Sequence, residues 1–154
     1  MTTLNDRAEL IEVMSHYADI ADLKEFDALP GRVYTDEVSF DFSSVTGTPP
    51  MTIALSQYVE VLRASFAAFK ATHHAITGHV IEIDGDKARI HAHVRAEHWL
   101  PDELTADGAG PWLVVGFYDN EAIRTPEGWR LTHVTLTAIH QENQPRLPDA
   151  VPTA

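Results

Sequence analysis

The segment THHAITGHVIEIDGDKARIHAHVRAEHW, residues 72–99, contains two alternating stretches joined by Asp84-Gly85-Asp86. Asp-Gly favours the positive backbone φ angles of a tight hairpin turn, so the segment predicts two antiparallel strands. Six of the nine histidines of the chain lie within it. The first question is therefore which of these histidines face the protein interior.

The strand after the turn has one apolar face that ends in a histidine. Its members alternate along the chain: Ala88, Ile90, Ala92, Val94, Ala96 and His98. We therefore predict that His98 lies at the rim of a buried surface, whereas His91 and His93 face solvent or an interface. A His-x-His pair can bind a metal, but no carboxylate or further histidine is placed to complete the ligand set, so we predict no metal site.

The strand before the turn is harder to assign, because both of its alternating rows contain apolar residues. A β-bulge would explain this pattern, and Gly78 is the predicted position. Periodicity alone does not choose between His73 and His74. In the last strand of the chain, His133 and His140 are predicted to be surface or interface residues.

The N-terminal segment predicts an amphipathic helix from about Asp6, with Asn5 as its N-cap. Its expected buried stripe consists of small and apolar residues at helical spacing: Ala8, Ile11, Met14, Ala18 and Ala21. Asp22, four residues after Ala18, extends the same stripe by one step. A carboxylate on a buried edge is costly unless it is paired. The alternative is that the helix has ended there, so that Asp22 is solvated or caps the next turn.

The remaining elements predict an α+β fold, in which N-terminal helices pack on one face of a curved antiparallel sheet to form a cone-shaped barrel. The expected elements are a helical turn at 25–29, a strand at 37–42, a loop at 43–50, a long helix at about 53–70 and further strands at 112–124 and 129–141. The mouth of such a cone is a ready ligand pocket. Residues 1–141 form the predicted single domain, and 142–154 a tail that is extended or disordered.

Composition limits the partners. The net charge is −12 with only 11 basic residues, which argues against nucleic-acid and anionic membrane binding. With no cysteine, no secretory signal and no apolar run near 18 residues, we expect a cytoplasmic protein. The expected partners are a hydrophobic small molecule and further copies of the chain, in a dimer or trimer. Trp99, Trp112 and either Val114 or Val115 are predicted on the exposed sheet face that pairs.

The element order and three segments resemble the nuclear transport factor 2-like superfamily. The segments are ADIADLKEFDA at 18–28, THHAITG at 72–78 and EGWRL at 127–131. Within the superfamily the chain is most similar to the SnoaL-like branch, alongside scytalone dehydratase and hexachlorocyclohexane dehydrochlorinase. The resemblance covers about residues 5–141.

In these two lyases, an aspartate at the end of the first helix orients a histidine that opens the strand after the long helix. The resemblance places them at Asp22 and His74, and it places a second pocket histidine of scytalone dehydratase at His98. That enzyme also holds a water between two tyrosines, whose positions match Ala21 and Phe42 here. Tyr17 and Tyr118 could replace the missing hydroxyls, so Tyr17, Phe42 and Tyr118 are the expected substrate contacts.

These assignments predict a general acid/base enzyme that needs no cofactor: a lyase or dehydratase, an isomerase, or a polyketide cyclase. His74 would be the base, Asp22 its orienting partner, and His98 a second acid or a hydrogen-bond donor to developing negative charge. The alternative is a binding or assembly module without catalysis, in which Asp22 and His74 form a structural ion pair. The small subunit of a ring-hydroxylating oxygenase would be one such module.

Overall fold

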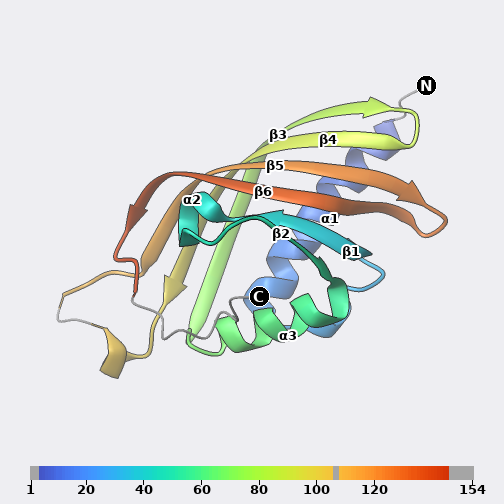
Figure 1. Ribbon diagram of the computed structural model, residues 1–154. Coiled ribbons are helices and arrows are strands. Elements are labelled where there is room, and N and C mark those ends of the chain that lie inside the picture. Colours follow the sequence, from blue (N-terminus) through green and yellow to red (C-terminus); the bar gives the residue numbers. More distant parts are fainter. Residues whose placement is uncertain (1–3, 106–107, 146–154) are drawn as a thin grey trace.

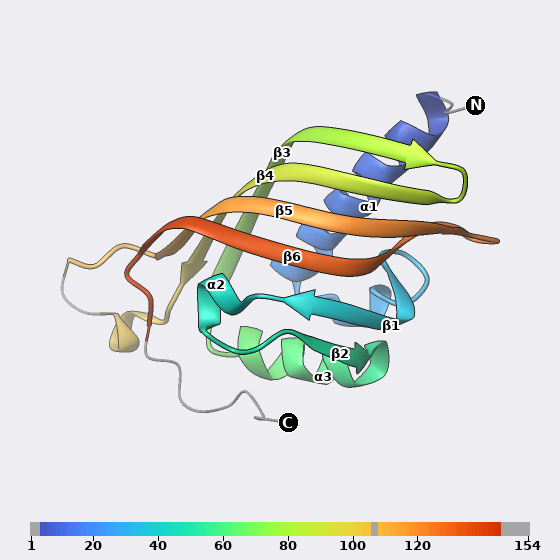
Figure 2. The same cartoon turned by 45° about the horizontal axis from the view of Figure 1, so that its top comes forward.

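The computed structural model describes residues 4–105 and 108–145, which form a strongly curved sheet with the two long helices on its concave side (Figures 1 and 2). The elements follow in the order α1 (Leu4–Leu23), η1 (Phe26–Ala28), β1 (Tyr34–Asp41), α2 (Ser43–Thr46), β2 (Met51–Ala54), α3 (Leu55–Phe66), β3 (Ala71–Asp84), β4 (Lys87–Trp99), η2 (Asp102–Leu104), β5 (Trp112–Thr125) and β6 (Gly128–Glu142). The α+β class predicted from the sequence is confirmed.

The six strands are arranged in the order β2-β1-β6-β5-β4-β3. Strands β3 to β6 form the predicted antiparallel meander, and β2 pairs with β1 antiparallel. The sheet is antiparallel as predicted except at one pair of strands, because β1 runs parallel to β6. Two strands joined by a short turn must run antiparallel, but parallel strands need a long connection. The connection from β1 to β6 is long, since it includes α3, β3, β4 and β5.

The histidine-rich hairpin forms as predicted. Asp84 pairs with Lys87 across a two-residue turn, in which Gly85 has a φ of 59°. The register of β3 against β4 shifts between Thr77 and Val80, and Gly78 has a φ of 64°. This bulge reverses the inward row of β3, because His74 is buried before it and Ile81 after it.

The buried face of α1 differs from the predicted stripe. Only Met14 and Ala21 of that stripe are buried, whereas Ala8 and Ile11 are exposed and Ala18 is half-buried. The face that packs on the sheet also carries the larger side chains Leu10, Val13, Tyr17 and Ile20. Alanine occurs on several faces of this helix, so the large side chains determine which face is buried. Asn5 lies inside α1, whose described part begins at Leu4, and is therefore not its N-cap.

The predicted loop at 43–50 begins with the short helix α2. Strand β2, at Met51–Ala54, begins directly after residue 50. The predicted helix at 53–70 is correspondingly shorter, since Ala54 still has an extended backbone and α3 ends at Phe66. Elements of four residues are too short to produce a clear periodicity. Of the predicted tail, Glu142 belongs to β6, and residues 146–154 lie outside the described part.

Trp112 and Val114 point into the protein and not to an exposed face, since they are 8% and 2% exposed. The sequence is apolar at three successive positions, Leu113, Val114 and Val115, so alternation could not fix the direction of this strand. Trp99 and Val115 are half-buried. That the chain forms a homo-oligomer stays a prediction. Trp112 and Val114 are buried within the chain and are therefore not its contact residues. Within the described residues, none of the helices is long and apolar enough to cross a membrane.

Candidate active site

A mostly apolar cavity of about 210 Å³ lies inside the cone. Its walls come from the sheet, α1 and α3, and include Phe40, Leu62, Phe66 and Val114. A cavity of about 150 Å³ can admit benzene, so the space suits a ligand of about one ring. Five of the six predicted site residues line it: Tyr17, Phe42, His74, His98 and Tyr118.

The sixth, Asp22, lies behind His74 in the last turn of α1. Its carboxylate accepts hydrogen bonds from the His74 backbone N–H at 2.8 Å and from the Thr72 hydroxyl at 2.9 Å. The His74 ring contacts the same carboxylate, with Nδ1 at 2.6 Å from Oδ1. Burial raises the pKa of Asp22, but these hydrogen bonds outweigh it, and the pKa lies below the ordinary value. Asp22 is therefore a buried-edge carboxylate held ionised by three donors, and not a solvated cap.

The contact with Asp22 determines which nitrogen of His74 is available for chemistry. Ionised Asp22 can only accept, so Nδ1 of His74 carries the hydrogen and Nε2 of the neutral ring has a free lone pair. The ring packs against Phe66 at a centroid distance of 6.2 Å and against the edge of Tyr17 at 5.9 Å. His74 is thus fixed in orientation and tautomer at the wall of an apolar cavity.

His98 lies beside His74 on the neighbouring strand, with ring centroids 5.4 Å apart. It stacks on Trp112 at 4.6 Å, and its Nδ1 lies 3.2 Å from the Trp112 carbonyl oxygen. Burial, followed by the proximity of His74, lowers the pKa of His98 to about 4. A carbonyl oxygen only accepts, so neutral His98 carries its hydrogen on Nδ1. The expected role as an acid or a donor does not fit this arrangement, because Nε2 then has no hydrogen to give.

The four tyrosines of the chain are all buried around this site. Tyr17 contacts both Tyr34 and Tyr118 edge-on, each at a centroid distance of 6.2 Å. Burial raises the pKa of Tyr17, with a smaller opposite effect of its contact with Tyr118, and burial also raises the pKa of Tyr118, so both hydroxyls stay protonated at neutral pH. Tyr34 and Tyr58 were not predicted from the sequence as part of this group. Tyr58 lies on the predicted apolar side of the long helix, whereas Tyr34 precedes the predicted strand.

The family follows from comparison of the whole chain. A family model described as the SnoaL-like domain matches residues 2–135. The chain belongs to the SnoaL-like family. The resemblance to the nuclear transport factor 2-like superfamily is thereby confirmed, and the cone of this SnoaL-like domain is the fold that the resemblance implied.

Solved structures support the same assignment. The SnoaL-like domain is similar to the Kfla4162 protein of Kribbella flavida, with 68% identity, coverage of 90% of this chain and 94% of that chain, and a TM-score of 0.88. A Novosphingobium aromaticivorans protein with the provisional name aromatic ring hydroxylase is 25% identical, with coverage of 92% and 95% and a TM-score of 0.79. A type 2 hexachlorocyclohexane dehydrochlorinase shares the fold at 16% identity, with coverage of 98% and 97% and a TM-score of 0.74.

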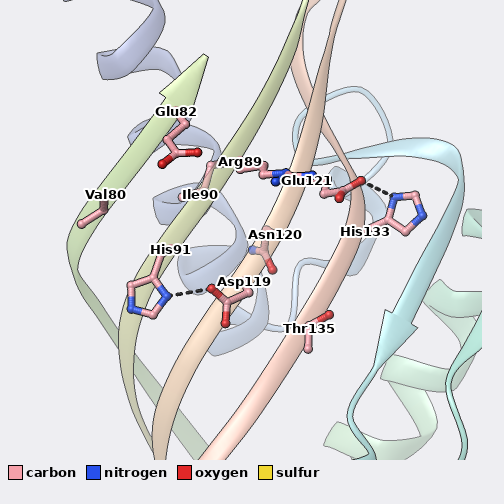
Figure 3. A pocket seen from close by; sticks show the side chains of 10 residues that line it. All are labelled: Val80, Glu82, Arg89, Ile90, His91, Asp119, Asn120, Glu121, His133 and Thr135. Carbon is pink, nitrogen blue, oxygen red and sulfur yellow. Dashed lines mark hydrogen bonds and ion pairs between the residues drawn. The ribbon is translucent and has the colours of Figure 1, made fainter. Parts of the chain in front are cut away.

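The outer face of the SnoaL-like sheet carries a second set of histidines, as predicted. Figure 3 shows His91 paired with Asp119 and His133 with Glu121 in a pocket on the side opposite α1. The His91 Nδ1–Asp119 Oδ1 distance is 2.7 Å, but the two side chains are 40% and 59% exposed. Among the described residues, no three His, Asp or Glu side chains converge in a way that could hold a metal ion.

Proposed function

We propose that this SnoaL-like protein is a general acid/base enzyme that needs no cofactor and acts on a small hydrophobic molecule as a lyase, isomerase or cyclase. The observation that carries the proposal is the 2.6 Å contact between His74 Nδ1 and Asp22 Oδ1 at the wall of an apolar cavity. A merely structural ion pair would not need to border a space of about 210 Å³. The cavity thus favours catalysis over a purely structural pair.

In the proposed reaction, Nε2 of His74 removes a proton from a carbon next to a leaving group or a carbonyl. Asp22 stabilises the imidazolium that forms and keeps the ring in the tautomer that can act as a base. Tyr17 and Tyr118 line the same cavity and stay protonated, so a hydroxyl hydrogen can be donated to negative charge that develops on the substrate. A positioned base of this kind supplies about 10²–10⁴-fold in rate.

The name of one relative supports this class of reaction. A dehydrochlorinase by its name removes hydrogen and chlorine from its substrate, and such an elimination requires loss of a proton from carbon, as proposed for His74. At 16% identity this likeness concerns the fold. The proposal therefore depends on the arrangement of Asp22 and His74 in this chain.

The test is proton exchange at carbon, measured by NMR in deuterated water. The probes are hexachlorocyclohexane and a panel of single-ring ketones and hydroxyketones, with chloride or water release followed in parallel. We expect the wild-type protein to accelerate exchange or elimination of at least one probe, and His74→Ala and Asp22→Asn to reduce the rate 100-fold or more. Circular dichroism checks that both variants fold. Folded variants that keep the wild-type rate would overturn the proposal.

The second candidate is a binding or assembly module without catalysis. The mostly apolar lining of the cavity favours it, since such a cavity can hold an aromatic ring without any proton transfer. Under this alternative, single-ring aromatic probes bind but no probe exchanges protons, and Asp22→Asn changes only the free energy of unfolding. Proton exchange that depends on His74 would exclude it.

A further inference from the structure

The Nε2 atom of His98 is the feature of the cavity that the proposed reaction leaves unused. His98 is almost completely buried and lines the cavity, and its Nδ1–H is committed to the Trp112 carbonyl at 3.2 Å. Within the described part of the chain, no group donates a hydrogen bond to Nε2. The lone pair of this nitrogen is therefore an acceptor inside an apolar chamber.

The reverse tautomer would be more costly. A hydrogen on Nε2 of the neutral ring would remove it from Nδ1, and two acceptors, Nδ1 and the Trp112 carbonyl, would then face each other. A buried acceptor without a donor costs about 1–3 kcal/mol. The stack of His98 on Trp112, at 4.6 Å, also holds the ring in the orientation that makes the Nδ1 hydrogen bond.

We propose that His98 is a substrate-recognition residue that accepts a hydrogen bond from an O–H or N–H group of the ligand. The ligand class is then a molecule of about one ring that carries a hydroxyl or N–H donor close to the carbon that loses its proton to His74. The part about His74 rests on the proposed function, whereas the acceptor role of His98 does not. The 5.4 Å separation of the two rings allows both to contact a single small ligand.

This role differs from those of the other polar groups of the cavity. The tyrosine hydroxyls can both donate and accept, so they do not select a donor. His74 Nε2 is also an acceptor, but in the proposed reaction it faces the carbon that is deprotonated. A ligand without a donor would leave His98 Nε2 desolvated and unpaired, and such sites discriminate strongly against analogues that lack the matching group.

The test compares phenol with toluene, which have nearly the same shape but differ in the donor. Affinities are measured by calorimetry for the wild-type protein, for His98→Phe and for the outer-face control His91→Phe. We expect the phenol-to-toluene affinity ratio to fall about tenfold in His98→Phe, the size of one hydrogen bond. The ratio should stay within twofold of wild type in His91→Phe. An unchanged ratio in folded His98→Phe would overturn the proposal.

A second measurement needs no variant. In a long-range ¹H–¹⁵N spectrum of the wild-type protein, the His98 ring should show a hydrogen on Nδ1 and none on Nε2, and phenol but not toluene should shift Nε2. A hydrogen on Nε2 in the free protein would contradict the proposal. Neither readout requires turnover, so a failure of His98 recognition is distinguishable from a failure of the His74 reaction.

Discussion

Two histidine–carboxylate pairs lie on opposite faces of the same sheet and have nearly the same geometry. His74 and Asp22 are 2.6 Å apart on the inner face, and His91 and Asp119 are 2.7 Å apart on the outer face. Their exposures differ greatly: the inner side chains are 5% and 20% exposed, the outer ones 40% and 59%. A short histidine–carboxylate contact therefore does not distinguish the two faces. The difference lies in how far each pair is buried.

The inner pair has two features that the outer pair lacks. Asp22 receives two further hydrogen bonds, from Thr72 and the His74 backbone, which fix its position. His74 borders a mostly apolar cavity, where electrostatic effects are stronger than in water. The outer pair is largely exposed to solvent, which screens it and leaves it worth about 0.2–1 kcal/mol. The predictions below test this difference between the two faces.

The largest expected effect is on catalysis. His74→Ala should reduce kcat/KM by about 10²–10⁴-fold for any substrate found by the proton-exchange screen, because it removes the base. His91→Ala should stay within twofold of wild type, although it removes the same chemical group from the same sheet. Steady-state kinetics on both purified variants checks this. Equal losses in the two variants would refute a special role of the inner face.

The next effect concerns the acid sensitivity of folding. The pKa of His98 is lowered to about 4, against about 6.5 in the unfolded chain, so the unfolded state binds more protons between these values. Stability should therefore fall as the pH drops from 6.5 to 4, by up to about 1.4 kcal/mol per pH unit from this residue. His98→Phe should reduce the slope in urea titrations, whereas His91→Phe should keep it. A wild-type slope in His98→Phe would show that burial does not depress this pKa.

A smaller effect is expected on stability from the carboxylates. Asp22→Asn should lower the free energy of unfolding by about 1–3 kcal/mol at pH 7, because a charged acceptor of buried donors is lost. The matched change Asp119→Asn should cost less than about 0.5 kcal/mol. Since the pKa of Asp22 is lowered, its contribution is present above pH 3.8 and disappears as the pH falls through the folded pKa. Urea denaturation at several pH values measures both variants.

The smallest effect is the coupling across the outer pair. A double-mutant cycle with His91→Ala and Asp119→Ala should give a coupling free energy of less than about 1 kcal/mol. This coupling should vanish in 1 M salt. The corresponding cycle on His74 and Asp22 should give a larger coupling that persists in salt. Similar, salt-sensitive couplings in both cycles would mean that burial does not separate the two pairs.

Much of the site could be predicted because strands have a simple two-residue period. Alternation alone assigned His98 to the inner face and His91 and His93 to the outer face, and the structure agrees. The bulge at Gly78 makes β3 ambiguous, so the choice of His74 over His73 came from the family resemblance. Asp22 lies one helical step beyond Ala18, but only the fold brings it to His74.

Other features depend on tertiary contacts that no local pattern reports. The α1 stripe was misplaced because alanines occur on several faces, and Trp112 and Val114 were misplaced because β5 is apolar on consecutive positions. The tyrosine group is assembled from α1, β1, α3 and β5, so its members share no spacing in the sequence. The proposed role of His98 depends on a carbonyl fourteen residues away, at Trp112.

The central claim is that Asp22 and His74 act as one catalytic unit. The most direct test is kcat/KM for Asp22→Asn, His74→Ala and the double variant on one substrate, with circular dichroism as the check on folding. Because groups of one unit are strongly non-additive, we expect the double variant to be no more than about tenfold slower than His74→Ala alone. Losses that multiply, or an Asp22→Asn variant with wild-type kcat/KM, would contradict the account.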